Sequence, residues 1–408
     1  MRVAFLTQDL QLSGGVGVVV EHASRLAADH GFDVTLVHTG VRTEREWRFR
    51  GLDGLHVLGL AEAVQREYDV AVSTWWETTA WLFDIRARRH ASFVQSLEDR
   101  FYADWMPERL AAAHSLDLPV AFITEARWIA RALDELRPGE RAALVRNGID
   151  KEVFAGPGTV TPATDGPLRI VIEGSREIAF KAVDEALTAV SLMGEARHVT
   201  LVTPDESGEG APADRLLARL THAEMAALYG ESHVVLKLSR VEGMFGPPLE
   251  GFHAGATCVV TPVTGHEEYV RHRHNGLIVD WDDARGTARA LDLLARDRRL
   301  LHELRTNALA TARTWPSWRQ QSAVMAAALR RIAREPPPRA APLGRRLAHD
   351  FDMTLGDGQR RLVELSRVST QLDDVLGQRA YRWGVALRNA MWRSLRRPVR
   401  IARRLRRR

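Results

Sequence analysis

The stretch VVLKLSRVEGMFGPPLEGFHAG, residues 234–255, decides the fold because it joins an apolar strand, a loop and a helix start. Pro247 and Pro248 predict the first turn of that helix, where the missing N–H of proline is tolerated. Glu242 lies on the loop and Glu250 on the helix, so the two carboxylates can reach opposite ends of one ligand. The helix N-terminus between them offers free N–H groups and partial positive charge, which suit a phosphate.

Strands alternate with helices on both sides of this stretch. Upstream, the apolar run LRIVIEG ends in Gly174 and precedes the helical pattern AVDEALTAVSLM, and HVTLVTP and HAEMAALYGES repeat the pair. Downstream, CVVTPV and HNGLIVD are strand-like and precede the helical pattern of DARGTARALDLL. Such alternation predicts a parallel sheet that is covered by helices on both faces.

The N-terminal part of the chain contains a second array of the same kind. The buried run Arg2–Thr7 is followed by Gly14 and Gly15, a helical period and the strand-like FDVTLVHT, which together predict a βαβ unit. Glycines before a helix let a phosphate or a sugar approach the backbone closely. A plain tight turn is the alternative, because GGVG lacks the full dinucleotide-binding spacing.

A break rich in Pro, Gly and Thr separates the two arrays. We predict an α/β fold with two Rossmann-like, doubly wound domains that face a cleft, since ligands favour the carboxyl ends of strands there. The predicted parts are an N-terminal domain at residues 1–153, a linker at 154–167, a C-terminal domain at 168–314, a crossover helix at 315–334, and a Pro-rich spacer with a helical basic tail at 335–408.

The composition is that of a globular protein. The chain has 408 residues, of which 45% are hydrophobic and 27% charged. The opening MRVAFLTQDL is too quickly polar for a signal peptide, and no window is apolar enough for a spanning helix. The single cysteine, Cys258, lies in the apolar run TCVVTP, which predicts a buried structural thiol. We therefore expect a cytoplasmic protein.

Positive charge is concentrated at the C-terminus. The formal net charge is +5, but residues 375–408 contain 12 arginines and no acidic residue, so the rest of the chain is mildly acidic. The arginines and tryptophans of Tyr381–Arg408 suit an anionic membrane surface at the inner face of a membrane, and a solvated tail is the alternative. Nucleic acid is less favoured because nothing else is typical of base recognition. Upstream, Phe351–Gln378 has a narrow apolar stripe that predicts a docked helix or a short coiled coil.

Two cations follow the strand that ends at Gly174. Arg176 and Lys181 would each be an ordinary surface charge alone, but beside Glu242 and Glu250 the pair can neutralise a diphosphate. The histidines show no metal-ligand spacing, and neither a Ser-His-Asp order nor a P-loop is present, so we expect no metal.

At this point a resemblance becomes specific. GSREIAFK, SRVEGMFGPPLEGFHAG, VTPVTGHEEYV and NGLIV, in this order, resemble the donor half of retaining glycosyltransferase family 4, which has the GT-B fold. RNGID resembles the end of the first half, and TWPSW resembles the start of the final helix that crosses back to it. The resemblance covers about residues 1–333. It implies a nucleotide-diphosphate sugar donor, no required metal and retention of anomeric configuration.

The resemblance also implies residue roles. Arg176 and Lys181 would hold the diphosphate. Glu242 would hold the sugar hydroxyls and Glu250 the ribose hydroxyls, and Arg176, Lys181 and Glu242 would be catalytic. Gly15 would approach the donor phosphate or the acceptor, and backbone N–H groups of the loop would cradle the donor. The other donor-binding positions would be Gly174, Gly243, Met244, Phe245, Gly246 and Leu249.

The chain departs from the family pattern at two places. The usual EGFG is EGMFG here, so Gly246 is displaced by one position although the Glu-to-Glu spacing is intact. A histidine and an aspartate that many members carry after a strand are replaced by Gln95 and Ser96. The segment VQSLEDRFY instead resembles a subgroup similar to bacterial rhamnosyltransferases of surface polysaccharide synthesis. The acceptor-side candidates are Gly14, Gln95, Glu98 and Asp99.

The implied reaction is transfer of a hexose or deoxyhexose to a glycan or lipid-linked acceptor. No general base is assigned, because in a front-face retaining mechanism the leaving phosphate can take the acceptor proton. Two alternatives stay open. One is a nucleotide-sugar 2-epimerase on the same fold, and the other is a catalytically silent assembly partner that docks through residues 345–408.

Overall fold

A computed structural model describes most of the chain. The described residues are 1–40, 49–162, 166–205, 207–338, 343–348, 355, 356, 358–361, 363, 365, 367, 368 and 372. Contacts divide the chain into two units, Met1–Phe351 and Asp352–Arg408. The described residues of the second unit are helical, and the predicted membrane-binding segment lies outside the described residues.

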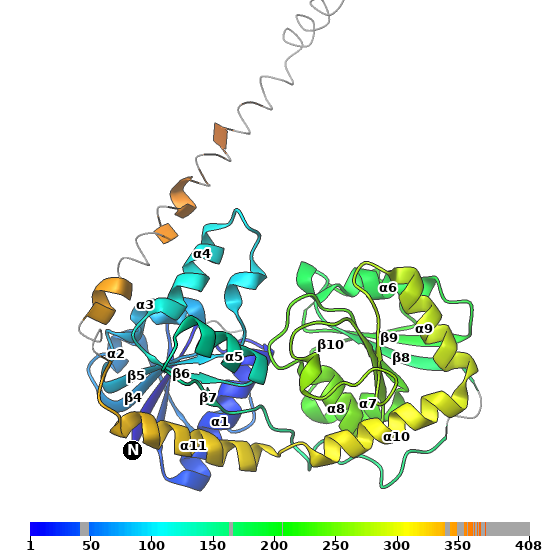
Figure 1. Ribbon diagram of the computed structural model, residues 1–408, viewed down its shortest axis with the longest axis horizontal. Coiled ribbons are helices and arrows are strands. Elements are labelled where there is room, and N and C mark those ends of the chain that lie inside the picture. Colours follow the sequence, from blue (N-terminus) through cyan, green and yellow to red (C-terminus); the bar gives the residue numbers. More distant parts are fainter. Residues whose placement is uncertain are drawn as a thin grey trace, which may run out of the picture. The chain divides into compact units, whose positions relative to one another are not determined.

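The first half of the larger unit is built on a parallel sheet with strand order β3-β2-β1-β4-β5-β6-β7 (Figure 1). Because β1 pairs with both β2 and β4, the chain winds outward from the centre in two directions, as in doubly wound folds. The elements are β1 (Arg2–Thr7), α1 (Gly14–His30), β2 (Asp33–His38), β3 (His56–Gly59), α2 (Leu60–Ala63), β4 (Glu67–Ser73), α3 (Thr79–Leu82), β5 (Arg86–Val94), α4 (Pro107–His114), β6 (Ala121–Thr124), α5 (Arg127–Leu136) and β7 (Ala143–Leu144).

The second half repeats this plan with strand order β10-β9-β8-β11-β12-β13, again wholly parallel. Its elements are β8 (Leu168–Glu173), α6 (Val183–Ser191), β9 (Arg197–Thr203), β10 (Arg215–Ala218), α7 (His222–Glu231), β11 (Val234–Lys237), α8 (Gly246–Ala254), β12 (Thr257–Val260), β13 (Leu277–Ile278), α9 (Ala284–Arg296) and α10 (Arg298–Thr314). The predicted α/β class with two parallel, doubly wound halves is confirmed. The strands β3 and β10 were not predicted, because HVLG and RLLA are too short to show a period.

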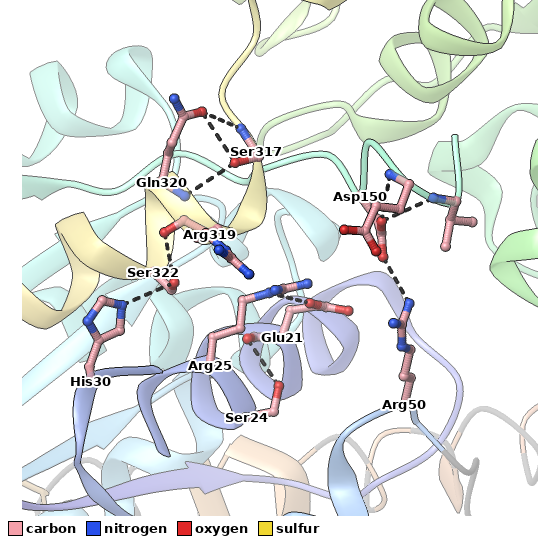
Figure 2. Close-up of polar contacts among 12 residues, drawn as sticks. Glu21, Ser24, Arg25, His30, Arg50, Asp150, Ser317, Arg319, Gln320 and Ser322 are labelled. Atoms are coloured by element: carbon pink, nitrogen blue, oxygen red, sulfur yellow. Dashed lines mark hydrogen bonds and ion pairs between the residues drawn. The ribbon is translucent and has the colours of Figure 1, made fainter. Parts of the chain in front are cut away.

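The last helix of the larger unit, α11 (Trp318–Arg334), packs on the first half although it follows the second in sequence (Figure 1). Its apolar face joins the cluster formed by α1 and the first sheet, and the side chains that it contributes are Met325, Ala326, Ala328, Leu329 and Ile332. Figure 2 shows its start, where Ser317 and Gln320 form a capping box, and Ser322 beside His30 of α1 at 3.4 Å. Asp150, also in Figure 2, accepts from Arg50 at 3.2 Å.

Residues 343–348, which the sequence prediction assigned to the spacer and tail, also pack against the first half. Arg345 pairs with Asp84 at 3.3 Å, and Ala348 is buried in the cluster around Phe83. No helix in the described part of the chain has both the length and the apolarity of a membrane span.

The parallel strands bring charged residues to one edge of the second sheet. β8 ends in Glu173 and β11 in Lys237, and the two strands are neighbours whose register pairs Ile172 with Leu236. The loops that follow these strands carry Arg176, Lys181 and Glu242, so this carboxyl edge holds the candidate site.

Candidate functional site

The centre of the candidate site is an ion pair between the loop that follows β8 and the loop that follows β11. Lys181 Nζ lies 2.9 Å from Glu242 Oε1, and the two side chains are 25% and 12% exposed. Burial would raise the pKa of Glu242, but the ammonium groups of Lys181 and Lys237 outweigh it and lower the pKa. Glu242 is therefore an ionised acceptor at neutral pH, and Lys181 is a partly exposed cation beside it.

A second lysine, Lys237, lies behind this pair and is almost fully buried, at 3% exposure. Its ammonium group donates to the carbonyl oxygen of Glu173 at 3.1 Å and forms an ion pair with the Glu173 carboxylate. Burial would lower the pKa of Lys237, but Glu173, Glu242 and Glu250 raise it. Lys237 is therefore a permanent positive charge among three carboxyl groups.

Glu250 projects from the second turn of α8. Burial, together with the carboxylate of Glu173, raises its pKa to about 7, while Lys237 opposes both. Glu250 consequently changes its charge near neutral pH, unlike Glu242, although both belong to the same motif.

The loop between the two glutamates adopts a strained conformation. Phe245 is the N-cap of α8 and has φ 62° and ψ 61°, in the left-handed region that disfavours a side chain, whereas Gly246 does not share that region. The sequence departure therefore places a phenylalanine at the left-handed position. The side chains of Met244, Phe245 and Leu249 lie in the hydrophobic core, so only their backbone can face a ligand.

Arg176 lies on the same edge but does not contact Glu242. Its guanidinium pairs with Asp184 in the first turn of α6 at 2.6 Å and reaches the carbonyl oxygen of Ser207 at 3.4 Å. Gly174, which precedes it, has φ 145°, and an added Cβ would lie 3.1 Å from Val183. Arg176 is thus held at the base of α6, and a diphosphate would have to compete with Asp184 for it.

The first half contacts the loop between Glu242 and α8 through three groups. Glu125 Oε1 accepts the Met244 N–H at 3.0 Å, and Trp128 Nε1 donates to the Gly243 carbonyl oxygen at 2.8 Å. An added Cβ on Gly243 would lie 1.9 Å from the Gln95 carbonyl oxygen, so only glycine fits there. The Met244 N–H, which we expected to cradle the donor, is therefore occupied by Glu125.

The acceptor-side candidates lie in different surroundings. Gln95 donates to the Thr74 carbonyl oxygen at 3.3 Å, and its amide lies 3.4 Å from where a Cβ on Gly15 would be. Gly14 is exposed and has open space around it, and Asp99 is half-buried.

Glu98 is buried and accepts the Trp76 N–H at 2.6 Å. Burial raises its pKa well above the usual range, against the Trp76 hydrogen bond, which lowers it.

Aromatic rings line the seam beside Lys181. Phe180 stacks on Phe101 with centroids 4.9 Å apart, and Phe101 stacks on Trp75 at 5.8 Å. Lys181 Nζ lies 5.5 Å from the centroid of the Phe180 ring. The segment 95–102 and the Lys181 loop are therefore in direct contact, and apolar ring faces suit a sugar.

A cavity of about 780 Å³ lies elsewhere in the second half. Its lining includes Arg169 near the start of β8, His233 directly before β11 and Ala254 at the end of α8, so it lies at the amino edge of the sheet, opposite the edge that carries Glu242. Within the described ranges, no group of three or more His, Cys, Asp or Glu side chains is placed to hold a metal ion. The chemistry of the motif residues, not cavity size, therefore identifies the candidate site.

Sequence reasoning missed Glu125, Glu173 and Lys237. Each lies at the carboxyl end of an apolar strand, since Glu173 and Lys237 are the last residues of β8 and β11 and Glu125 directly follows β6. A charged residue at the end of a buried parallel strand was the signal that could have found them.

Comparison with known proteins agrees with this geometry. Residues 215–311 match the family model of glycosyl transferases group 1, a segment that contains β11, the loop and α8. No curated protein sequence gives a significant match.

Solved structures show the fold. HepE from Anabaena in complex with UDP and glucose has a TM-score of 0.66 at 15% identity, covering 81% of this chain and 100% of that one. Sucrose-phosphate synthase from Thermosynechococcus elongatus has a TM-score of 0.64 at 14% identity, covering 81% and 98%. TarM from S. aureus has a TM-score of 0.64 at 8% identity, covering 82% and 100%. The chain thus has the two-domain GT-B fold.

Proposed function

We propose that this chain is a retaining glycosyltransferase of family 4 that transfers a hexose or deoxyhexose from a nucleotide-diphosphate sugar to a glycan or lipid-linked acceptor. The observation that carries the proposal is the Lys181–Glu242 ion pair beside the N-terminus of α8, of which Glu242 and α8 lie within the group 1 match. The ligands of HepE, UDP and glucose or UDP-glucose, support a nucleotide-sugar donor. The subgroup resemblance of VQSLEDRFY supports a rhamnosyltransferase-like role in bacterial surface polysaccharide synthesis.

In this proposal Lys181 moves from Glu242 to the donor diphosphate. The N–H of Gly246 at the start of α8 and Arg176 share the same charge, which grows as the bond to the sugar breaks, whereas Pro247 and Pro248 have no N–H to donate. Glu242 accepts hydrogen bonds from the sugar hydroxyls and keeps the ring oriented while positive charge develops on it. Glu250 accepts the ribose hydroxyls from the opposite end of the loop.

Retention would follow if the acceptor attacks from the face that the diphosphate leaves. The departing phosphate oxygen then takes the acceptor proton, so no side-chain base is required. We expect product formation to survive EDTA, because lysine, arginine and helix N–H groups supply the positive charge. The anomeric configuration of the product, read by NMR coupling constants, decides between retention and inversion.

The two rival functions have distinct signatures. A 2-epimerase would convert a sugar nucleotide without releasing nucleoside diphosphate, and a silent assembly partner would do neither. The ionised Glu242 beside a partly exposed Lys181 favours an enzyme over a silent protein, which has no need of this pair. Release of nucleoside diphosphate then separates transfer from epimerisation.

The experiment is a turnover screen of sugar nucleotides, with dTDP-rhamnose tested first and UDP-glucose next. We expect nucleoside diphosphate release from one donor, with loss of at least about a hundredfold in Glu242→Ala. Glu303→Ala is the matched control, since Glu303 is a half-exposed carboxylate of α10 that pairs with Arg299. Release from no donor, or equal rates in Glu242→Ala and wild type, would contradict the proposal.

A further inference from the structure

Three consecutive residues between Glu242 and α8 each form a backbone hydrogen bond with one side chain. We call this segment the donor loop, after the role that the proposed function gives it. Trp128 donates to the carbonyl oxygen of Gly243, and Glu125 accepts the N–H of Met244. The hydroxyl of Tyr269 donates to the carbonyl oxygen of Phe245. The first two side chains belong to the first half and the third to the second half, so the loop is fixed from both sides.

The loop needs this restraint because of Phe245. A non-glycine residue in the left-handed region is sterically strained and persists only where its surroundings hold it there. The hydrogen bond of Glu125 is to the residue directly before Phe245 and fixes the peptide that leads into the strained position. Release of this bond would allow the loop to relax toward an ordinary conformation and move Glu242, two residues before Met244.

Glu125 is itself firmly anchored. It is 5% exposed, and its second oxygen accepts from Asn147 Nδ2 at 2.9 Å. The carbonyl oxygen of Asn147 in turn accepts from Trp315 Nε1 at 2.9 Å. A buried carboxyl that bonds a loop of the other half through one oxygen and its own half through the other is a bridge, not a surface charge.

We propose that Glu125 is a positioning residue of the donor site, which holds the donor loop in its active shape through the Met244 N–H. The inference rests on the glycosyltransferase function proposed above. It means that the first half, which the sequence assigned to the acceptor, also shapes the donor site. Glu125 itself touches no reacting atom in this proposal.

The charge state of Glu125 predicts which substitution it tolerates. Burial, together with the carboxylate of Glu242, raises its pKa to about 8, against its hydrogen bonds to Asn147 and Met244, which lower it. Glu125 is therefore mostly neutral at pH 7. Asn147 Oδ1 is buried without a hydrogen-bond partner, so a half-turn of that amide would let it accept from a neutral Glu125 or from glutamine.

The first test is hydrogen exchange of the loop amides at pH 7 in the full chain without ligand. We expect the Met244 amide to exchange at least about tenfold faster in Glu125→Ala, because it loses its acceptor, and at the wild-type rate in Glu125→Gln. Glu135→Ala on α5 is the matched control, since Glu135 is exposed and lies in the same half. Unchanged exchange in Glu125→Ala would overturn the proposal.

The second test is steady-state kinetics with the donor that the turnover screen identifies. Glu125→Ala should raise the donor KM about tenfold or more, with a smaller change in kcat, and Glu125→Gln should restore both values. A wild-type KM in Glu125→Ala, or failure of Glu125→Gln to restore it, would overturn the proposal. If wild type turns over no donor, the proposed function fails, whereas the exchange test still decides whether Glu125 holds the loop.

A third variant keeps the proposal testable if Glu125→Ala does not fold. Trp128→Phe removes the hydrogen bond to Gly243 and part of the buried ring over which Arg100 lies, but it keeps an aromatic ring in place. We expect faster loop exchange and a raised donor KM in this variant. Wild-type exchange and KM in Trp128→Phe would count against the proposal that the first half holds the loop.

Discussion

At the scale of single residues, the carboxyl edge of the second sheet places two lysines beside three glutamates. Lys237 is coupled to Glu173, Glu242 and Glu250, and Lys181 offsets only Glu242 directly. Because the side chain of Lys237 is 2% exposed, its charge is poorly screened by water. The two lysines therefore have different tasks, since Lys181 is accessible to a ligand and Lys237 offsets the repulsion among the carboxylates.

Lys237→Met should destabilise the protein by about 3 kcal/mol, because it leaves Glu173 without its buried partner. Adding Glu173→Gln to this variant should recover part of the loss, since the uncompensated charge is then removed. Urea unfolding at pH 7 measures both. A single variant within about 0.5 kcal/mol of wild type would show that the pair contributes little.

Glu250 predicts a pH dependence of donor affinity. Its raised pKa of about 7 means that the carboxyl is mostly protonated below that pH and ionised above it. The ionised form accepts two ribose hydroxyls better, so affinity should rise as pH increases through about 7. Calorimetric titration from pH 5.5 to 8.5 measures this rise, which Glu250→Gln should abolish and Glu303→Gln should keep. An identical rise in Glu250→Gln would assign it to another group.

At the scale of elements, the loop and helix α8 show what the sequence could predict. The strand, the two glutamates and the proline-marked helix start follow from local pattern and from the family resemblance. The left-handed Phe245 does not, because that region ordinarily requires glycine and the neighbouring glycine lies one position later. The sequence alone therefore does not predict the strained backbone at Phe245.

Because Phe245 is strained, we expect a glycine variant at this position to be more stable than an alanine variant, the reverse of the usual order in a helix. Both Phe245→Ala and Phe245→Gly lose a buried ring, but only glycine accepts φ 62° without a Cβ clash. We expect Phe245→Gly to be more stable than Phe245→Ala by about 1 kcal/mol in urea unfolding. At Phe252, in the middle of α8, the same pair should show the opposite order. Greater stability of the alanine variant at position 245 would disprove the strain.

At the scale of the whole molecule, contacts between the halves could not be predicted. Glu125 and Met244 are 119 positions apart, and their contact depends on how two separately predictable sheets meet. Lys181 and Glu242 are also distant in sequence, but the resemblance places both at the donor edge. Thus the sequence predicts the fold and the core of the candidate site, whereas the hydrogen bonds from Glu125 and Trp128 to the loop are known only from the structure.

The basic C-terminal segment gives a prediction from composition alone. Each basic residue near an anionic membrane surface contributes about 1 kcal/mol of attraction, so removal of residues 381–408 should greatly weaken binding to anionic liposomes. Donor hydrolysis in solution should be unchanged. A liposome sedimentation assay measures the first effect, with neutral liposomes as the control. Equal binding of the truncated and full-length chains would reject a membrane role.

In the proposed function, the edge that carries Lys181 and Glu242 binds a nucleoside diphosphate. The most direct measurement is calorimetric titration of wild type and Lys181→Met with UDP and dTDP. We predict that one of them binds wild type and binds Lys181→Met at least about tenfold more weakly, because a charge-assisted contact is lost. Lys151→Met, which removes a lysine that donates to the Arg313 carbonyl oxygen, should bind as wild type. Binding of neither nucleotide, or equal affinity in Lys181→Met, would contradict nucleotide binding at this edge.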